Sequence, residues 1–475
     1  MLSCGPRATL TRHGILHIHW RPNASLRAPT LPVQRYRQIQ TATVTDSDIA
    51  RLASKPLHPL TLADLCSHGR PPLSTASLLD SANFTLSILP SRLAHRIQSI
   101  RALPYIVVAN PNVSRIHANY VHSLSTLLPY AERSGGRRIE TLEEEVQFTE
   151  VMADLVNTHA NTISILARGF LEARKYISKA EVTRFLDEHL RARIGTRLIA
   201  EQHIALHFSS QPHSDDQTPH HGYESSYIGV IDTALRPADI IRSCEATVGE
   251  ICELKYGVRP SVEIIGNPET TMAHIPMHLE YVLTELLKNS FRATIEAGME
   301  KEAVQVTIAP APATGEQMSK SADKDVSAAQ GLEKHGEGVI SPERQGAVDV
   351  AAGGNGSGVI RALDKSTPGV TIRIRDRGGG ISPQVYRDLW EYGFTTFNED
   401  EIHDKTSGGG GAGGMNAFDV ISGGAGGGSS LAGLGYGLPL GRAYAEYFGG
   451  GIAVQSLWGW GTDVYVSLRG VGRVD

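Results

Sequence analysis

Long hydrophobic runs are missing from this sequence: none of its 475 residues lies in an apolar stretch of the about 18 residues that a membrane-spanning helix needs. We therefore expect a protein that is not inserted in a membrane. Cysteine is scarce as well, and Cys4, Cys66, Cys244 and Cys252 have neither metal-site spacing nor the density of a disulfide-linked scaffold. This pattern favours a reducing compartment.

Acidic residues and lysine are absent from the first 45 residues, and the first carboxylate of the chain is that of Asp46. The same segment holds six arginines: Arg7, Arg12, Arg21, Arg27, Arg35 and Arg37. An arginine-rich, acid-free leader is typical of a mitochondrial presequence, so we predict one over residues 1–45, with a disordered basic tail as the alternative. Loss of these six positive charges would change the formal net charge from −5 to −11. Such an acidic chain is not expected to bind nucleic acid.

Apolar residues recur at three- and four-residue steps in 91–108, 141–177 and 179–208. This period predicts long amphipathic helices, and the short breaks between them predict a helical bundle over residues 46–215. A polar stretch, 209–226, then marks a domain boundary. The length of the chain allows two or three domains of this size.

After residue 226 the pattern changes to short strands alternating with helices. Strands are expected at YIGVID, SVEIIG, 303–309 and 369–376, and two more at IAVQSL and TDVYVSLR near the end. The expected helices are PADIIRSCEATVGEICELKYG, 280–296 and 438–450. The second half of the chain is therefore predicted to be an α/β sandwich, which gives an α+β protein.

Two segments of this second half lack any such period. Residues 310–358 are polar and rich in glycine, alanine and serine, and we predict a disordered insertion there. Many of the 49 glycines lie in a second stretch, 406–433, which we expect to be flexible.

The helix predicted over 280–296, EYVLTELLKNSFRATIE, has an unusual polar side. Glu285, Asn289 and Arg292 share one face, with Tyr281 one turn earlier. The opposite stripe is apolar and consists of Leu279, Val282, Leu283, Leu286 and Ala293. A neutral amide oxygen is a ligand that suits Mg²⁺, and a carboxylate one turn away suits a general base. In isolation, a solvated face with no function explains the same residues.

Two glycine-rich turns add to this helix. Asp376 ends a predicted strand and is followed by Gly378, Gly379 and Gly380, which would let a ring approach the backbone while the carboxylate accepts from an amine. The second turn, 433–437, spaces three glycines at the start of a helix, where unhindered amides form an anion site. Each turn alone is weak evidence for a ligand.

The order of the three motifs is specific. The segments ELLKN (285–289), DRGGG (376–380), GLGYG (433–437) and GWGTDV (459–464) together resemble the nucleotide site of the GHKL superfamily, which contains gyrase, heat-shock chaperone, histidine kinase and mismatch-repair ATPases. The resemblance implies a GHKL-type domain over 226–470, with a mixed sheet covered by helices on one face. It also implies ATP binding and an ATP lid over residues 397–432.

Within this superfamily the chain most resembles the mitochondrial protein kinases of 2-oxoacid dehydrogenase complexes. The resemblance rests on ELLKNSFRAT, FTT (394–396), RAYAEYFGG (442–450) and GTDVYVSLR (461–469), and on RLAHRIQSIRALPYIV and FLDEHLRARIGTRL in the helical half. It covers the chain from about residue 55 to 470 outside the insertion and lid. The segments AHRI, YGFTT and GTDVYVSLR favour branched-chain 2-oxoacid dehydrogenase kinase, and pyruvate dehydrogenase kinase is the alternative.

This resemblance implies a serine kinase of the mitochondrial matrix that phosphorylates and inactivates the E1α subunit of its complex. It also implies docking on the lipoyl domain of E2, and a homodimer. Glu285 would be the base on the substrate hydroxyl, and Asn289 the Mg²⁺ ligand. The residues implied to contact ATP are Asn289, Arg292, Asp376, Gly378, Gly380, Thr395, Thr396, Ala432, Gly433, Gly435, Gly437, Leu438 and Thr462. K⁺ would bind backbone carbonyls of Leu389, Glu391 and Phe394.

Two other classes of protein, histidine kinases and non-catalytic ATP-binding scaffolds, could carry the same nucleotide motifs. A histidine kinase normally carries an acid directly after its phosphoacceptor histidine, and among the nineteen histidines His403 alone is followed by one, in the loop before the lid. A non-catalytic ATP-binding scaffold on the E2 core stays open as an alternative. The joint presence of Glu285, Asn289 and Asp376 argues against it, because a scaffold could lose the base without losing ATP.

Overall fold

The computed structural model describes residues 42–57, 60–131, 139–211, 225–311, 369–393 and 435–470, all within one compact unit. Most of the predicted presequence lies outside these ranges. So do the predicted lid, 397–432, and the predicted insertion from residue 312 onward. Within the described ranges, none of the helices combines the length and the apolarity that crossing a bilayer requires.

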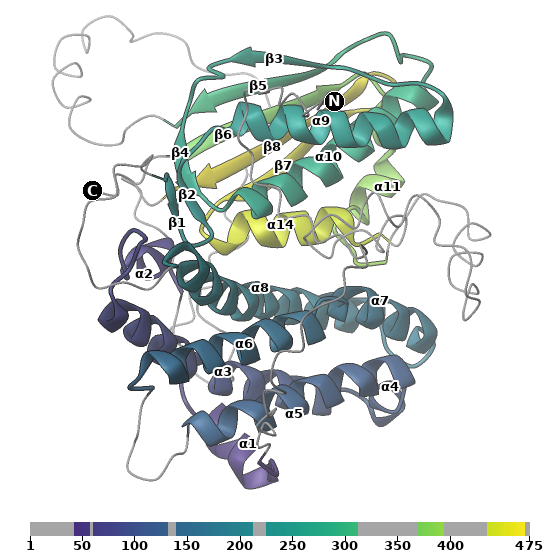
Figure 1. Ribbon diagram of the computed structural model, residues 1–475. Coiled ribbons are helices and arrows are strands. Elements are labelled where there is room, and N and C mark those ends of the chain that lie inside the picture. The colour runs from purple at the N-terminus through teal and green to yellow at the C-terminus, as the bar shows by residue number, and fades with distance from the viewer. Residues whose placement is uncertain are drawn as a thin grey trace, which may run out of the picture. The chain divides into compact units, whose positions relative to one another are not determined.

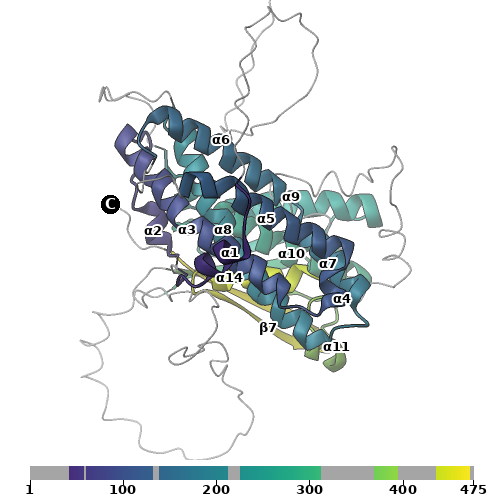
Figure 2. The same ribbon diagram turned by 90° about the horizontal axis from the view of Figure 1, so that it is seen from below.

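Eight helices precede the first strand in the described chain. They are α1 (Asp46–Ala53), α2 (Leu62–Cys66), α3 (Thr75–Arg101), α4 (Tyr105–Val108), α5 (Pro111–Ala131), α6 (Leu142–Thr158), α7 (Thr162–Ala173) and α8 (Lys179–Ser209). Figure 2 shows α3, α5, α6 and α8 running side by side as a bundle. Leucine and isoleucine side chains of these helices form its core.

Two predicted helical stretches are each divided: 91–108 contains the end of α3 and α4, and 141–177 contains α6 and α7. At the break between α6 and α7, the carbonyl of His159 accepts from Arg193 of α8 at 3.1 Å and from the Thr162 amide at 3.3 Å. By contrast α8 begins where the sequence predicts: Ser178 and Glu181 form a capping box, each bonding the other's backbone amide.

The second half contains a five-stranded mixed sheet in the order β3-β5-β6-β8-β7, in which β3 and β5 are parallel and the other neighbours antiparallel. Its strands are β3 (Val262–Gly266), β5 (Val304–Pro310), β6 (Gly369–Asp376), β7 (Gly451–Leu457) and β8 (Gly461–Arg469). A smaller sheet, which was not predicted as such, joins β1 (Tyr227–Ile228), β2 (Ile231–Leu235) and β4 (Met272–His274).

Helices α9 (Pro237–Tyr256) and α10 (Pro276–Glu296) cover one face of the large sheet (Figure 1). Both begin with proline, which suits the first position of a helix because an amide hydrogen there would have no acceptor within the helix. A short helix, α11 (Pro383–Arg387), follows β6. The last helix, α14 (Gly437–Tyr447), packs on α10 and on α8 and so joins the bundle to the sheet. The predicted α+β fold class is confirmed.

Candidate functional site

Helix α10 has the two faces that its sequence predicts, except that Ala293 of the apolar stripe is half-buried and lies against Gly378. Leu279, Val282, Leu283 and Leu286 are buried against the sheet and α9, in the core of the second half. The Glu285 side chain lies on the other side and is 13% exposed, and Asn289 one turn further is exposed. The side of α10 that faces away from the core thus carries the candidate base and the candidate metal ligand.

The Glu285 carboxylate is held from two directions. Its Oε1 atom accepts from the Lys288 ammonium at 2.6 Å, and its Oε2 atom lies directly against Gly437, the first residue of α14. A Cβ at position 437 would overlap that oxygen, so any other residue there would require the end of the Glu285 side chain to move. The sequence prediction omitted Lys288, although its place three residues after Glu285 is a signal for such a pair.

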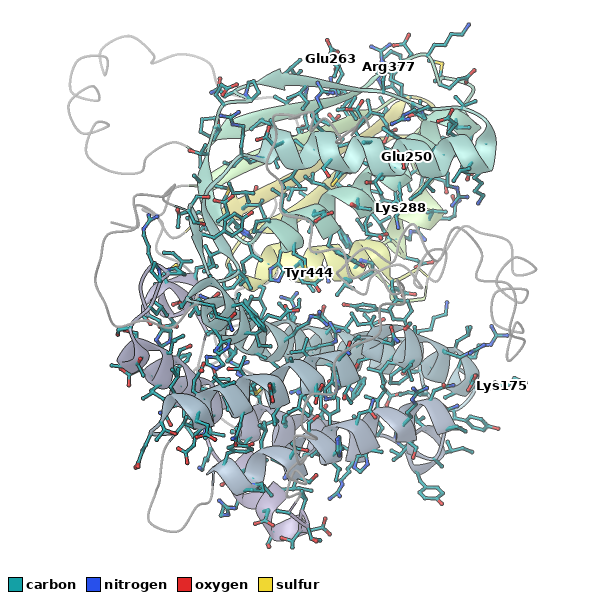
Figure 3. All side chains as sticks on the ribbon, in the orientation of Figure 1. Lys175, Glu250, Glu263, Lys288, Arg377 and Tyr444 are labelled. Carbon is teal, nitrogen blue, oxygen red and sulfur yellow. The ribbon has the colours of Figure 1, made fainter. Side chains whose placement is uncertain are left out.

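Tyr281 lies one turn before Glu285 and packs its ring against Tyr444 of α14, with 5.1 Å between ring centroids. Figure 3 labels Lys288 and Tyr444 on these two helices. The Tyr281 hydroxyl is buried and makes no hydrogen bond to the described residues. Burial, and next the nearby Glu285 carboxylate, raise the pKa of Tyr281 well above its usual range, so the phenol stays protonated.

Asp376 is the last residue of β6 and is 6% exposed. It follows Ile372 and Ile374 in the two-residue period of the strand, so its carboxyl points to the face that α10 covers. Burial raises the pKa of Asp376, while hydrogen bonds from the Gly378 and Thr462 amides and from Ser290 act in the opposite direction. The Gly378 amide lies 2.9 Å from Oδ1. This is a buried acceptor beside a glycine turn.

The glycines after Asp376 allow close contacts between backbones. Gly378 lies against Ala293 of α10, where a Cβ would collide with it. Gly380 has φ +74°, which disfavours other residues, and it meets the carbonyl of Leu457. The Gly379 carbonyl accepts a hydrogen bond of 2.7 Å from the Gly459 amide, in the turn between β7 and β8.

Thr462 of β8 pairs directly with Asp376 in the sheet, and its hydroxyl lies 3.1 Å from that of Ser456. The structure therefore brings Asp376, Gly378 and Thr462 together beside Ser290 and Ala293 of α10, which were not predicted as site residues. Arg292 points elsewhere: its guanidinium pairs with Glu296 one turn further along α10. Its predicted contact with nucleotide stays a prediction.

The remaining predicted residues surround the start of α14. Leu389 and Glu391 lie in the turn after α11, Gly435 precedes α14, and Leu438 lies in its first turn. The Gly393 amide donates to the Gly435 carbonyl at 3.2 Å, so the turn and the start of α14 are adjacent. The predicted residues Phe394, Thr395, Thr396, Ala432 and Gly433 lie outside the described residues.

The donors available for a metal ion fit Mg²⁺ brought in with a phosphate ligand. In the part of the chain that the structure describes, histidine, cysteine, aspartate and glutamate side chains do not gather in threes as a preformed metal site. Asn289 is exposed beside Glu285 and offers one amide oxygen. Mg²⁺ commonly takes one or two protein ligands and fills its other positions with phosphate and water.

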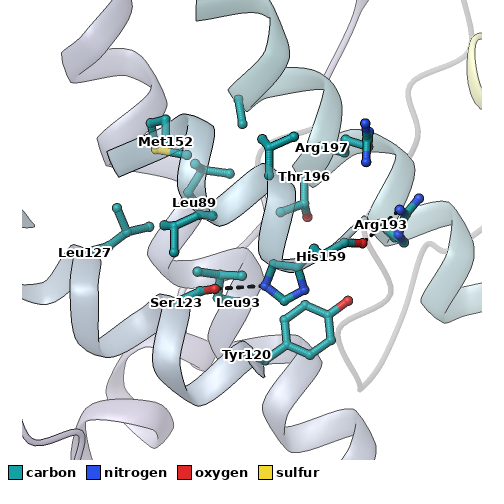
Figure 4. A pocket seen from close by; sticks show the side chains of 13 residues that line it. Leu89, Leu93, Tyr120, Ser123, Leu127, Met152, His159, Arg193, Thr196 and Arg197 are labelled. Atoms are coloured by element: carbon teal, nitrogen blue, oxygen red, sulfur yellow. Dashed lines mark hydrogen bonds between the residues drawn. The ribbon is translucent and has the colours of Figure 1, made fainter. Parts of the chain in front are cut away.

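A separate cavity lies inside the bundle, between α3, α5, α6 and α8 (Figure 4). The His159 ring and the Ser123 hydroxyl form a hydrogen bond of 2.8 Å, while Arg193 and Arg197 line the side formed by α8. Burial, and next Arg193, lower the pKa of His159 to about 4, so its ring is neutral near pH 7. None of the residues predicted to bind nucleotide lines this cavity.

Comparison with known proteins points to one group of kinases. The model of the family described as "Mitochondrial branched-chain alpha-ketoacid dehydrogenase kinase" matches residues 59–232. A relative from Saccharomyces cerevisiae, pyruvate dehydrogenase (acetyl-transferring) kinase 1, mitochondrial, is 27% identical, with 89% of this chain and 86% of the relative covered. The mitochondrial pyruvate dehydrogenase kinase of Arabidopsis thaliana is also 27% identical, over 83% and 86%. Isozyme 4 from Mus musculus is 25% identical, over 88% and 85%.

Proposed function

Since the chain belongs to the family of mitochondrial 2-oxoacid dehydrogenase kinases, we propose that it phosphorylates a serine of the E1α subunit of pyruvate dehydrogenase and so inactivates that complex. It is a protein serine/threonine kinase of the mitochondrial matrix. ATP is the proposed phosphate donor, with Mg²⁺ and K⁺ as the proposed ions. The lipoyl domain of E2 is the proposed docking partner, and a homodimer the proposed assembly.

The choice of pyruvate dehydrogenase reverses the preference that short motifs suggested. The relatives that align over most of this chain are named pyruvate dehydrogenase kinases, whereas the family model with the branched-chain description matches residues 59–232 alone. Segments such as AHRI and GTDVYVSLR are a few residues long, so they weigh less than alignments of 400 residues and more. Branched-chain 2-oxoacid dehydrogenase stays the second candidate because of the match over the bundle.

The observation that carries the proposed phosphoryl transfer is the layout of α10. Near its middle, Glu285 lies against the first residue of α14, and two turns later Ala293 lies against the glycine turn that follows Asp376. The eight-residue step from Glu285 to Ala293 spans about 12 Å of helix, comparable to the distance from an adenine ring to the terminal phosphate of an extended ATP. Helix α10 thus separates Glu285, the proposed base at the phosphate end, from the glycine turn beside Asp376, the proposed acceptor for the adenine amine.

In the proposed mechanism Asp376 accepts a hydrogen bond from the adenine amine, and the amides at the start of α14 bind phosphate oxygens. Asn289 would hold Mg²⁺, which neutralises phosphate charge when bound. Glu285 takes the proton of the serine hydroxyl as its oxygen forms a bond to the γ-phosphorus and the bond from that phosphorus to the β–γ bridging oxygen breaks. ADP leaves, and Lys288, which donates to the Glu285 carboxylate, keeps it oriented between turnovers.

The test is transfer of ³²P from ATP to purified pyruvate and branched-chain dehydrogenase E1, each supplied with its own lipoyl-bearing E2. Wild type is compared with Glu285→Gln and with Glu250→Gln, the same change at an exposed position of the adjacent helix α9. Label on a serine of pyruvate dehydrogenase E1α, lost in Glu285→Gln and kept in Glu250→Gln, supports the proposal. Label on the branched-chain enzyme instead favours the second candidate. ATP binding without any transfer would leave the scaffold interpretation.

A further inference from the structure

A cluster of charged side chains joins the bundle to the start and end of α14. Arg191 of α8 is its centre: Nε lies 3.0 Å from Oδ2 of Asp187, one turn earlier, and Nη2 pairs with Glu446 near the end of α14. The Tyr392 hydroxyl donates to Oδ1 of Asp187 at 3.3 Å. These four residues, which we call the Arg191 cluster, come from three segments that are distant in sequence.

A second arginine extends the contact around the turn at residues 388–393. Arg442 of α14 lies 3.7 Å from Glu446, and its guanidinium lies 4.6 Å from the centre of the Trp390 ring. Tyr392 packs its ring against Tyr436, directly before α14, with centroids 5.5 Å apart. The turn and α14 are thus fixed to each other and, through Arg191, to α8.

The cluster is more than an exposed ion pair. The side chains of Arg191, Asp187 and Glu446 are 22%, 29% and 32% exposed, and Arg191 meets two carboxylates at once. Burial lowers the pKa of Arg191, but Asp187 and Glu446 outweigh it and the net pKa is raised. Exposed single pairs contribute little to stability, whereas networks with good geometry contribute more.

Arg191 contacts α14 at Glu446, near the end of that helix, and is linked to the 388–393 turn through Asp187 and Tyr392. The same two segments carry one side of the proposed nucleotide site. The first turn of α14 supplies Gly437 and Leu438, and the turn before it supplies Leu389 and Glu391. We propose that Arg191 is a positioning residue for nucleotide binding, which fixes the phosphate-binding start of α14 and the 388–393 turn to the bundle. This inference rests on the proposed function.

The connection has a consequence for the bundle. Linkage between two sites is reciprocal, so if α8 helps to order α14 for nucleotide, bound nucleotide must in turn stabilise α8. The apolar contacts between α14 and the bundle, made by Leu440, Ala443 and Tyr447, do not depend on Arg191. We therefore expect substitutions at Arg191 to fold and to alter the coupling rather than the architecture.

The experiment compares wild type with Arg191→Met, Arg191→Lys and Arg168→Met. Arg168 is the control because its ion pair, with Glu172 at 3.9 Å, stays within α7. Two quantities are measured on the full chain without protein substrate: the Kd for ATP by calorimetry, and hydrogen exchange of residues 185–195 with and without ATP. The kcat and the KM for ATP are then measured with E1.

We expect Arg191→Met to raise the Kd and the KM for ATP about tenfold, equivalent to about 1.4 kcal/mol, with kcat within about twofold of wild type. Arg191→Lys should recover part of the loss, and Arg168→Met should match wild type. ATP should protect α8 from exchange in wild type and not in Arg191→Met. If Arg191→Met does not fold, Glu446→Gln probes the same contact from α14, with the same expectations.

An unchanged Kd together with ATP-dependent protection of α8 in the folded Arg191→Met protein would overturn the inference while leaving the proposed kinase intact. A loss of kcat at unchanged KM would also overturn it, because that pattern belongs to the transfer step. If wild type itself binds no ATP, the proposed function fails and takes the inference with it, which is a distinguishable result.

Discussion

Each half of the protein buries a carboxylate, and the two carboxylates have different kinds of hydrogen-bond partner. Glu145 of α6 is fully buried inside the bundle, where His207 lies 2.9 Å away and the Thr149 hydroxyl donates at 3.2 Å. His203 lies 3.5 Å from the same carboxylate and also bonds Ser81. Every partner is a side chain fixed on a neighbouring helix or on the same one, so the network is closed.

Asp376 in the sheet has a different surrounding. Its partners are mainly backbone amides of a glycine turn, Gly378, and of a paired strand, Thr462, with the Ser290 hydroxyl as a third. The glycines there bring backbone close, as where Gly378 lies against Ala293. Burial of a carboxylate therefore does not by itself indicate a ligand site; the groups that surround its remaining lone pairs do.

The largest expected effect is on the catalytic rate, and it concerns the second half of the protein. Glu285→Gln should lower kcat by roughly 10² to 10⁴, the usual contribution of a general base, with the Kd for ATP within a fewfold of wild type. Steady-state transfer of ³²P and calorimetry measure the two quantities. A variant that keeps its kcat would remove Glu285 from the transfer step.

The next effect concerns stability in the bundle. Glu145→Ala should lower the free energy of unfolding by about 3 kcal/mol, because His207 and Thr149 lose a buried partner. Urea denaturation followed by circular dichroism measures it, and the Kd for ATP should not change in the folded fraction. A large change in Kd with little loss of stability would invert the comparison.

Asp376→Asn should do the reverse and raise the Kd for ATP by about ten- to a hundredfold, since an acceptor for the adenine amine is weakened. Stability at pH 7 should hold or rise. Because burial raises the folded-state pKa of Asp376, the ionised carboxylate destabilises the fold at neutral pH, and this penalty disappears as the pH falls through the folded and then the unfolded pKa. The stability of the wild type relative to the variant should therefore increase as the pH falls, which thermal melts between pH 7 and 4 can test.

The smallest expected effect is a pH dependence within the bundle. The folded-state pKa of His159 is lowered to about 4, so the neutral ring is favoured and stability is lost as the pH falls from about 6.5 toward 4. His159→Gln should flatten this part of the curve of Tm against pH by a few degrees. An identical slope in the variant would assign the acid sensitivity to other buried histidines, such as His203 and His274.

Local patterns predicted much of the fold and part of the site. The period of three and four marks α8, and the alternation along β6 places Asp376 on the covered face with Ile372 and Ile374. Spacing alone puts Glu285 and Asn289 together on α10. These features are predictable because each depends on residues within a few positions along the chain.

Contacts between distant segments were missed. The break between α6 and α7 contains no proline or glycine; the His159 carbonyl accepts from the Thr162 amide and also from Arg193, which is 34 residues away. Arg191 and Glu446 are 255 residues apart, and the residues next to each in the sequence do not predict their contact. Their meeting follows from how α14 packs on α8, which no local period encodes.

The sequence by itself determined which residues can do the chemistry: a carboxylate and an amide on one helix face, an aspartate at a strand end, and glycines where backbone must come close. The tertiary structure alone decided that Gly437 lies against Glu285 and that an arginine of the bundle pairs with the far end of the same helix. The physical reason is that periods and spacings follow from the covalent chain, whereas contacts across the chain follow from the packing of cores that many residues share.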